Sequence, residues 1–220
     1  VGITMSSNWK KTVKEYGEAL LIAVILAFFI RSFVVQAFKI PSGSMLETLQ
    51  IGDHLLVNKF LYGVKLPFVN ITVIPVTEPE SQDIIVFKFP EDPSKDFIKR
   101  VIGVPGDSIV IRDKKVYRNG KPLSEPYAQY TSSRSSPDPF PMDRWPPHRY
   151  VPEARDNLGP IEVPAGKYFV MGDNRDESYD SRFWGFVDQQ AIVGKAWRIY
   201  WSWRGLTEIR WNRIGDYVGE

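Results

Sequence analysis

The hydrophobic positions of this chain follow two different patterns that meet near residue 37. Residues 19–30 read ALLIAVILAFFI without one polar side chain, and apolar residues resume at 33–35. A helix that crosses about 30 Å of hydrocarbon needs about 20 residues, a length that the chain supplies from Tyr16 to Gln36. From Leu55 onward, short runs with alternating or continuous apolar character follow. We therefore predict one N-terminal transmembrane helix and then a domain built of β-strands.

The runs after Leu55 predict an antiparallel β-sheet domain. Two of them, 108–111 and 115–117, form an expected hairpin, and Asn119–Gly120 is the strongest turn signal in the chain. Between Leu55 and Ala191 no convincing helical period interrupts them. The fold class is therefore mainly β, with antiparallel strands. Further strands are expected at 55–60, 83–89, 97–104, 167–171 and, as one or two strands, 191–203.

Residues 128–164 differ from both patterns. They hold many of the 17 prolines, together with the runs SSRSS and PDPFP. Proline cannot donate to a strand ladder, so such a stretch packs poorly into a sheet. We interpret it as an irregular insertion in the β domain, or as the cap of a smaller subdomain.

Composition narrows the possible functions. The 28 basic and 26 acidic residues give a formal net charge of +2, which argues against a dedicated nucleic-acid-binding protein. The chain has no cysteine, which removes disulfides, a cysteine nucleophile and thiolate metal sites. Its two histidines, His54 and His148, leave little material for a histidine-based metal centre or triad. We expect neither a metal nor another cofactor.

Two polar residues lie in settings that favour catalysis. Ser44 lies in the turn-forming run Pro41 to Met45, where Gly43 allows close approach of a substrate backbone. Lys99 lies in an apolar strand, and burial lowers the pKa of a lysine because it disfavours the charged form. Strand alternation points Lys99 and Arg100 in opposite directions, so one can be buried while the other is solvated. Each candidate also has an ordinary explanation, a loop serine or an edge-strand lysine that blocks aggregation.

Three segments, in this order along the chain, resemble the boxes of the type I signal (leader) peptidases. They are Pro41 to Met45 (PSGSM), Lys99 to Asp107 (KRVIGVPGD) and Gly172 to Arg182 (GDNRDESYDSR). The resemblance covers most of residues 20–200 apart from the insertion. It implies a membrane-anchored serine endopeptidase that removes signal peptides from exported preproteins through an acyl-enzyme, after Ala-x-Ala-like sites. One departure is Glu47, where the family commonly has proline.

The resemblance also implies catalytic roles for individual residues. Ser44 would be the nucleophile and Lys99 the general base. The Ser42 hydroxyl and the Ser44 backbone N–H would form the oxyanion hole, which stabilises the charge of the tetrahedral intermediate.

Other residues would support the dyad or bind the substrate. Ser178 would orient the lysine amine, while Asp180 would pair with Arg182 or another cation to hold the loop. Asp173 and Asn174 are interpreted as structural. Seven residues would line the pockets for small side chains, although some could equally be core residues: Phe38, Ile40, Pro41, Met45, Leu49, Phe97 and Ile98.

The N-terminal apolar segment permits three interpretations: a retained anchor, a cleaved signal peptide and a buried globular helix. The lysines at 10, 11 and 14 and the Val-Gln-Ala sequence at 35–37 suit a signal peptide. We favour the anchor, because cleavage near Ala37 would remove Phe38 to Pro41 from the expected substrate site. Met5 is a plausible initiator, so Val1 need not be the native start.

The expected organisation follows from the anchor. Residues 1–15 form a cytoplasmic segment, 16–36 the anchor and 37–220 a protease domain on the outer face of a bacterial inner membrane. The excess of lysines before the span favours this orientation. The expected partners are preprotein signal peptides and the phospholipid membrane.

Three other hypotheses stay open. His54, ten residues after Ser44, could form a Ser–His pair, although its place at the start of a strand favours a surface histidine. Another Ser/Lys protease, such as a self-cleaving repressor, would need an N-terminal DNA-binding helix pair where this chain has an apolar span. An inactive membrane-tethered β-domain is disfavoured because Ser44 and Lys99 are both present.

Overall fold

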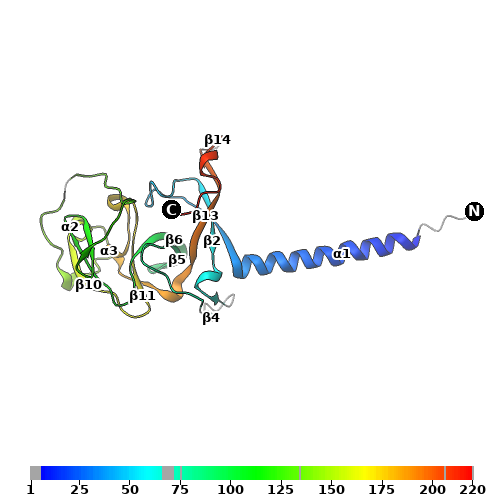
Figure 1. Ribbon diagram of the computed structural model, residues 1–220, viewed down its shortest axis with the longest axis horizontal. Helices are drawn as coiled ribbons and strands as arrows, with labels where there is room; N and C mark the ends of the chain where they lie inside the picture. Colours follow the sequence, from blue (N-terminus) through cyan, green and yellow to red (C-terminus); the bar gives the residue numbers. More distant parts are fainter. Residues whose placement is uncertain (1–5, 66–71, 75, 134, 206, 220) are drawn as a thin grey trace, which may run out of the picture.

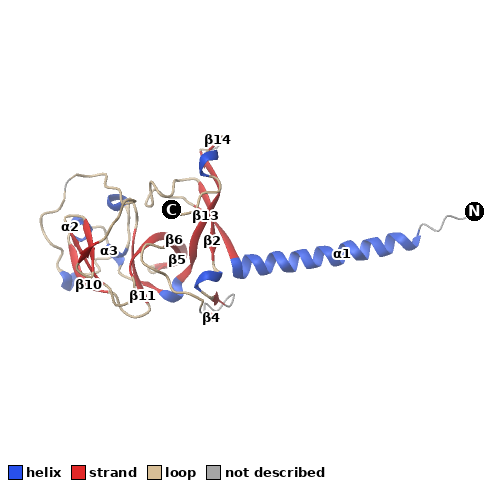
Figure 2. Ribbon diagram, viewed as in Figure 1, coloured by secondary structure: helices blue, strands red, loops and turns tan. Residues whose placement is uncertain are grey.

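The computed structural model describes residues 6–65, 72–74, 76–133, 135–205 and 207–219, so that Met5 lies outside the described residues. One long helix extends away from a body that holds the remaining described residues (Figure 1). Strands run through that body, and its helices are short (Figure 2). The named strands pair antiparallel, so the mainly β prediction is confirmed.

The helices and strands have the following bounds. The α-helices are α1 (Ser6–Phe29), α2 (Pro152–Asp156) and α3 (Ser181–Trp184), and a π-helical turn follows α1 at Ile30–Val34. Short 3-10 turns lie at Phe60–Tyr62, Met142–Arg144, Arg175–Glu177, Gln189–Ala191 and Trp211–Arg213. The strands are β1 (Val35–Lys39), β2 (Asp53–Asn58), β3 (Val64–Lys65), β4 (Thr72–Ile74), β5 (Ile84–Phe89), β6 (Asp92–Gly103), β7 (Ser108–Arg112), β8 (Lys115–Arg118), β9 (Lys121–Pro122), β10 (Leu158–Glu162), β11 (Lys167–Met171), β12 (Val187–Asp188), β13 (Ile192–Arg204) and β14 (Glu208–Ile209).

Helix α1 differs from the expected span over 16–36. Its α-helical part ends at Phe29, and Val35 and Gln36 belong to strand β1. The prediction is wrong at this end because Val35 pairs with Asn58 of β2, and sheet pairing overrides the apolar pattern. In the described part of the chain, none of the helices combines the length and the apolar character that a membrane crossing requires. Large apolar side chains of α1 are nevertheless exposed: Leu20, Leu21, Ile22, Val24, Ile25, Leu26, Phe28 and Phe29.

One eight-stranded sheet forms the centre of the body. Its order is β1-β2-β13-β5-β6-β11-β12, with β14 paired to the end of β13. The strands expected at 83–89 and 167–171 are confirmed as β5 and β11, and 191–203 forms the single strand β13. The strand expected at 97–104 is confirmed as β6, which begins earlier, at Asp92. The strand expected at 55–60 begins at Asp53 and ends at Asn58, whose side chain accepts the Leu61 N–H and starts a turn.

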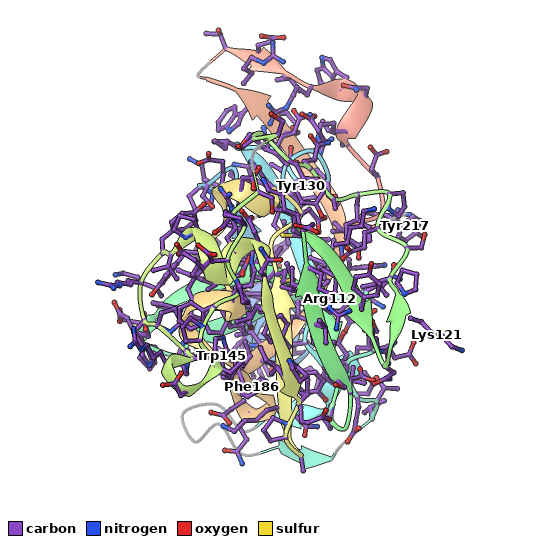
Figure 3. The ribbon with its side chains drawn as sticks, turned by 90° about the vertical axis from the view of Figure 1, so that its left-hand side faces the viewer. Arg112, Lys121, Tyr130, Trp145, Phe186 and Tyr217 are labelled. Carbon is purple, nitrogen blue, oxygen red and sulfur yellow. The ribbon has the colours of Figure 1, made fainter. Side chains whose placement is uncertain are left out.

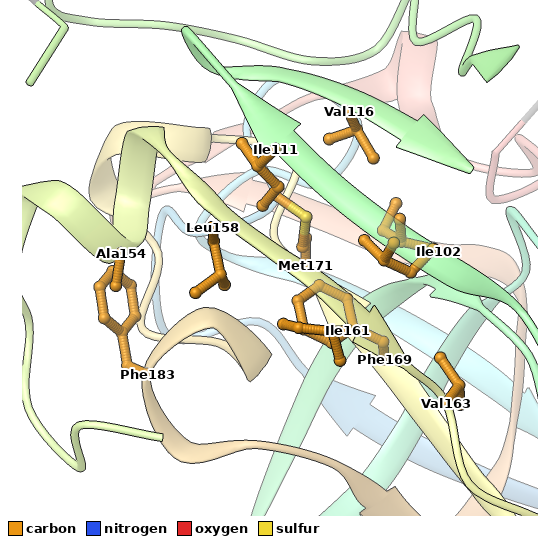
Figure 4. Packing of buried hydrophobic residues seen from close by; sticks show 11 residues of the cluster. Ile102, Ile111, Val116, Ala154, Leu158, Ile161, Val163, Phe169, Met171 and Phe183 are labelled. Atoms are coloured by element: carbon orange, nitrogen blue, oxygen red, sulfur yellow. The ribbon is translucent and has the colours of Figure 1, made fainter. Parts of the chain in front are cut away.

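A second sheet has the order β10-β7-β8-β9. Its buried side chains pack against those of β6 and β11 in the first sheet. The expected hairpin is confirmed as β7 and β8, and Asn119 and Gly120 form the turn into β9, both with positive φ. A buried apolar cluster joins the two sheets (Figure 4). Ile102 and Phe169 come from the large sheet, and Ile111 and Leu158 from the small one.

The proline-rich segment 128–164 is more ordered than predicted. It contains helix α2 and strand β10, which pairs with β7. A shift in register between Leu158 and Ile161 accommodates Pro160, because that residue lies where the ladder is interrupted. Trp145 of the same segment packs against Phe186, with ring centroids 5.1 Å apart (Figure 3). The segment is therefore part of the packed body.

Candidate active site

The three boxes meet at neighbouring parts of the large sheet. Ser44 lies in the loop between β1 and β2, and Lys99 lies on β6. Strand β11 pairs with β6, with Met171 opposite Arg100, so that the segment beginning at Gly172 continues beside Lys99. Residues that are 55 and more positions apart in sequence thus share one site because of strand order.

The Ser44 hydroxyl and the Lys99 amine are in direct contact. Lys99 Nζ donates to Ser44 Oγ at 2.8 Å and to the Ile98 carbonyl oxygen at 3.0 Å. Ser44 is 9% exposed and Lys99 is 4% exposed. The amine also lies 5.4 Å from the centre of the Phe97 ring. A nucleophile and a base at this separation can exchange a proton directly.

The surroundings of Lys99 favour its neutral form. Burial is the largest influence and lowers the pKa of Lys99 from 10.5 to about 8. The carboxylates of Asp180 and Asp173 oppose this shift, while the Arg182 guanidinium adds to it. At pH 8 Lys99 would therefore be neutral in about half of the molecules, whereas a free lysine is neutral in fewer than about one in 100.

Arg100, the neighbour of Lys99 on β6, is buried and not solvated. Its Nε and Nη2 donate to the two carboxylate oxygens of Asp173, at 2.8 and 2.6 Å, and its guanidinium carbon lies 3.7 Å from the centre of the Tyr127 ring. Strand alternation predicts that the side chains of Lys99 and Arg100 point to opposite faces of β6. It does not predict that the face of Arg100 is buried as well. The bidentate pair with Asp173 satisfies the buried charge.

Residues 172–174 fasten the loop that carries Ser44. The backbone N–H of Asn174 donates to the Ser44 carbonyl oxygen, and Asn174 Nδ2 donates to the Gly43 carbonyl oxygen, both at 3.1 Å. A Cβ atom on Gly172 would collide with Ser178 Oγ and with the Ser44 carbonyl oxygen. Only glycine therefore allows this close approach.

Asp180 forms the centre of a second buried group. Arg182 Nε and Nη2 each donate to one of its carboxylate oxygens at 2.8 Å, and the Gly172 N–H donates to it at 3.0 Å. Burial alone would raise the pKa of Asp180, but the Arg182 charge and these hydrogen bonds lower it. Ser178 Oγ is buried at the same place and helps to lower that pKa, and in the described part of the chain it makes no hydrogen bond to Lys99.

The predicted substrate residues divide by burial. Ile40, Met45 and Leu49 are 0–2% exposed and belong to one core cluster. Phe38 and Ile98 are half-buried against that cluster, while Phe97 stacks on Phe89 with ring centroids 4.3 Å apart. Pro41 is exposed, as is the predicted oxyanion-hole residue Ser42. Ile40, Met45 and Leu49 are therefore core residues, which is the alternative given for this set. Phe38, Phe97 and Ile98 are only half-buried and stay accessible to a substrate.

Neither histidine takes part in the Ser44 contact. The His54 ring packs against Tyr200 and Trp203, with centroid distances of 5.9 Å to each, and His148 Nδ1 contacts Glu91. Among the described residues no group of three or more His, Asp or Glu side chains is arranged to hold a metal ion.

Some of the contacts that shape the site leave no signal in the sequence. Thr48 Oγ1 donates to Asp173 Oδ2 at 2.6 Å, and Arg175, which is 1% exposed, pairs with Glu125. The partners are 125 and 50 positions apart, so no local pattern connects them.

Comparisons with known proteins identify the family of this chain. A family model described as signal peptidase, peptidase S26, matches residues 13–201. Signal peptidase I of Pseudomonas aeruginosa is 36% identical over 218 residues, with 89% of this chain and 75% of that protein covered. Signal peptidase I of Pseudomonas fluorescens is 38% identical over 221 residues, with the same coverage of 89% and 75%. A crystal structure of a signal peptidase I from Enterococcus faecalis is 32% identical, covers 54% of this chain and 97% of that one, and has a TM-score of 0.41. This chain therefore belongs to the signal peptidase family of serine endopeptidases, peptidase S26.

Proposed function

We propose that this chain removes signal peptides from exported preproteins, with Ser44 as nucleophile and Lys99 as general base. The observation that carries the proposal is the 2.8 Å hydrogen bond between Lys99 Nζ and Ser44 Oγ in a buried setting. A lysine whose pKa is about 8 can accept a proton near neutral pH and return it later, which an ordinary lysine does poorly.

The proposed reaction has two steps. Ser44 Oγ attacks the scissile carbonyl carbon while Lys99 takes its proton, and the Ser44 N–H and the exposed Ser42 hydroxyl stabilise the oxyanion. The C–N bond then breaks, Lys99 returns the proton to the leaving amine, and the signal peptide remains as an ester on Ser44. In the second step Lys99 takes a proton from a water molecule, which attacks the ester carbonyl carbon. The ester C–O bond then breaks, Lys99 returns that proton to Ser44 Oγ, and the signal peptide leaves with a free carboxyl group.

Support for the dyad would come from the groups around it. The Asp180–Arg182 pair and the Gly172 N–H keep the segment after β11 in place. Ser178 would influence the amine of Lys99 through this segment, since its hydroxyl makes no direct hydrogen bond to that amine in the described residues. An extended substrate would pair by its backbone beside the loop and place alternate small side chains, as in Ala-x-Ala, against Phe38 and Ile98.

We further propose that α1 holds the protease domain at a membrane. Apolar side chains along α1, among them Leu21, Ile25 and Phe28, are more than half exposed, and lipid would remove them from water. The anchor expected at 16–36 would then end at Val34, because Val35 and Gln36 belong to β1. Residues 1–15 would be the cytoplasmic segment and 37–220 the domain on the outer face of a bacterial inner membrane. Signal peptides also emerge from a membrane, so enzyme and substrate would be concentrated on one surface.

Loss of either member of the dyad should abolish cleavage. Ser44→Ala, Lys99→Met and Lys99→Arg should each lower the rate by about 10⁴-fold or more, because nucleophile and base act as a unit and a guanidinium does not lose its proton. The measurement is cleavage of a purified preprotein by full-length variants whose folding is checked by circular dichroism. His54→Ala is the matched control and should remain close to wild type. Activity retained by folded Lys99→Met would exclude the lysine base, and an inactive wild-type chain would favour the tethered β-domain.

The pH dependence of cleavage should report the ionisation of Lys99. Because only the neutral amine accepts the Ser44 proton, kcat/KM on a soluble peptide should rise about tenfold per pH unit below the pKa of Lys99, which is about 8, and level off above it. Burial and the nearby Lys39 charge hold the pKa of His54 below 6.5. If His54 were the base, the rise in kcat/KM would therefore be centred below pH 6.5. A rise centred below pH 6.5 would therefore contradict the assignment.

The apolar surface of α1 should matter only for membrane substrates. A full-length variant with Leu21, Ile25 and Phe28 changed to Glu should cleave a soluble peptide at the wild-type rate, since these side chains are 59–62% exposed. It should lose about 10²-fold or more on a preprotein inserted in liposomes, because the effective concentration falls. The comparison uses both substrates side by side, with Thr12→Glu as the control. An equal loss on both would show that α1 supports the fold and not membrane positioning.

A further inference from the structure

The loop that carries Ser44 ends at an aspartate buried by the C-terminal segment. Asp53, the first residue of β2, is 0% exposed. Its carboxylate accepts hydrogen bonds from Ser202 Oγ at 2.6 Å and from the Gln50 N–H at 2.8 Å. Two arginines complete its shell: Arg213 Nη2 at 2.6 Å and Arg210 Nη2 at 3.2 Å. A buried carboxylate of this kind needs such partners to remain charged.

The environment keeps Asp53 ionised. Burial alone would raise the pKa of Asp53, but the hydrogen bonds from Arg213, Ser202 and the Gln50 N–H lower it overall. The carboxylate therefore binds both guanidinium groups as an anion, which makes these contacts stronger than hydrogen bonds between neutral groups.

The same two arginines also contact the loop backbone. Arg213 Nη2 donates to the Thr48 carbonyl oxygen at 3.0 Å, and Arg210 Nη2 donates to the Ile51 carbonyl oxygen at 2.8 Å. Thr48 then continues the connection, because its hydroxyl donates to Asp173, the partner of Arg100 on the strand of Lys99. A chain of contacts thus leads from the C-terminal segment through the Ser44 loop to β6.

The C-terminal segment is itself fixed to the large sheet. Beyond the short strand β14, the Gly215 N–H donates to the Ile199 carbonyl oxygen, and the Ile199 N–H donates to the Asp216 carbonyl oxygen, at 2.8 and 2.9 Å. The Val218 N–H donates to the Trp197 carbonyl oxygen at 3.0 Å. The arginines therefore project from a support that is anchored to β13.

We propose that residues 208–218 hold Ser44 within reach of Lys99, and that Arg213 is the principal positioning residue. This segment lies beyond residues 13–201, which the family model matches. Arg213 differs from Arg210 because the loop backbone that it contacts belongs to Thr48, whose hydroxyl reaches Asp173. A displacement of about 1 Å in a nucleophile can cost about 10²-fold in rate. The inference rests on the proposed function, since its effect is on cleavage by Ser44.

A cavity beside Arg213 makes the proposal testable by chemical rescue. The cavity has a volume of about 670 Å³, and its lining includes Arg213, Thr48, Glu47 and Arg100. Removal of the Arg213 side chain would enlarge this space next to the Asp53 carboxylate. A free guanidinium ion can then enter from solvent and occupy the vacated position.

The experiment compares Arg213→Ala with the wild type and with Arg204→Ala, an exposed arginine at the end of β13 that serves as the matched control. For full-length Arg213→Ala we expect kcat on a soluble peptide to fall about 10- to 100-fold with KM nearly unchanged, since the loss is of orientation and not of binding. The pH midpoint should stay at that of the wild type, because Arg213 does not contact Lys99. Millimolar guanidinium chloride should restore part of kcat to Arg213→Ala and none to Ser44→Ala.

Two further variants cover the case in which Arg213→Ala folds poorly. Arg213→Lys keeps a cation but cannot serve both acceptors in the same geometry, and Thr48→Val removes only the hydroxyl that reaches Asp173. Each should lower kcat in a protein with wild-type circular dichroism. The proposal is overturned if folded Arg213→Lys and Thr48→Val both keep the wild-type kcat. It is also overturned if the loss of kcat in Arg213→Ala only follows the fraction of unfolded protein and guanidinium chloride does not restore it. If wild type itself is inactive, the proposed function fails, whereas an active wild type with unaffected variants refutes the positioning role alone.

Discussion

The burial of one lysine amine is the constraint on which the rest of this structure depends. An ammonium group is costly to remove from water. Burial in the sheet therefore favours the neutral amine and lowers the pKa of Lys99 to about 8. The amine is surrounded by β6, by the Ser44 loop and by the segment after β11, so that each of these elements must be in place for the shift to exist. Opposing carboxylates are present as well, and they prevent the pKa from falling further.

Buried ion pairs hold those elements together. Arg100 with Asp173 and Arg213 with Asp53 each join segments that the fold brings to the site, and Arg182 with Asp180 holds the segment after β11 in its shape. Such pairs add little net stability compared with apolar packing, but breaking one leaves a charge without a partner. Their contribution here is therefore geometric: they restrict the backbone positions that the Ser44 loop can adopt. The proline-rich segment is packed into the same body, as the pairing of β10 with β7 shows.

Local sequence patterns predicted much of the fold but only part of the site. Strands β5, β6 and β11 follow from their apolar runs, and Asn119–Gly120 marks its turn, because these signals lie within a few residues. The end of α1 and the strand β10 were missed because pairing with β2 and β7 decided them. Ser44 and Lys99 were found through family resemblance, since a lone serine or lysine is ambiguous. The Asp53–Arg213 contact joins residues 160 positions apart, which no local pattern reveals.

The most direct test of this account is the ionisation of Lys99 itself. Nuclear magnetic resonance of the full-length protein labelled with ¹³C at the lysine Cε position follows each amine through its titration, and Lys99→Arg identifies the signal that belongs to Lys99. The account predicts a pKa of about 8 for that signal, with the other lysines serving as internal references. A Lys99 signal that titrates near 10.5, the ordinary value, would contradict the proposal that burial prepares this lysine as the base.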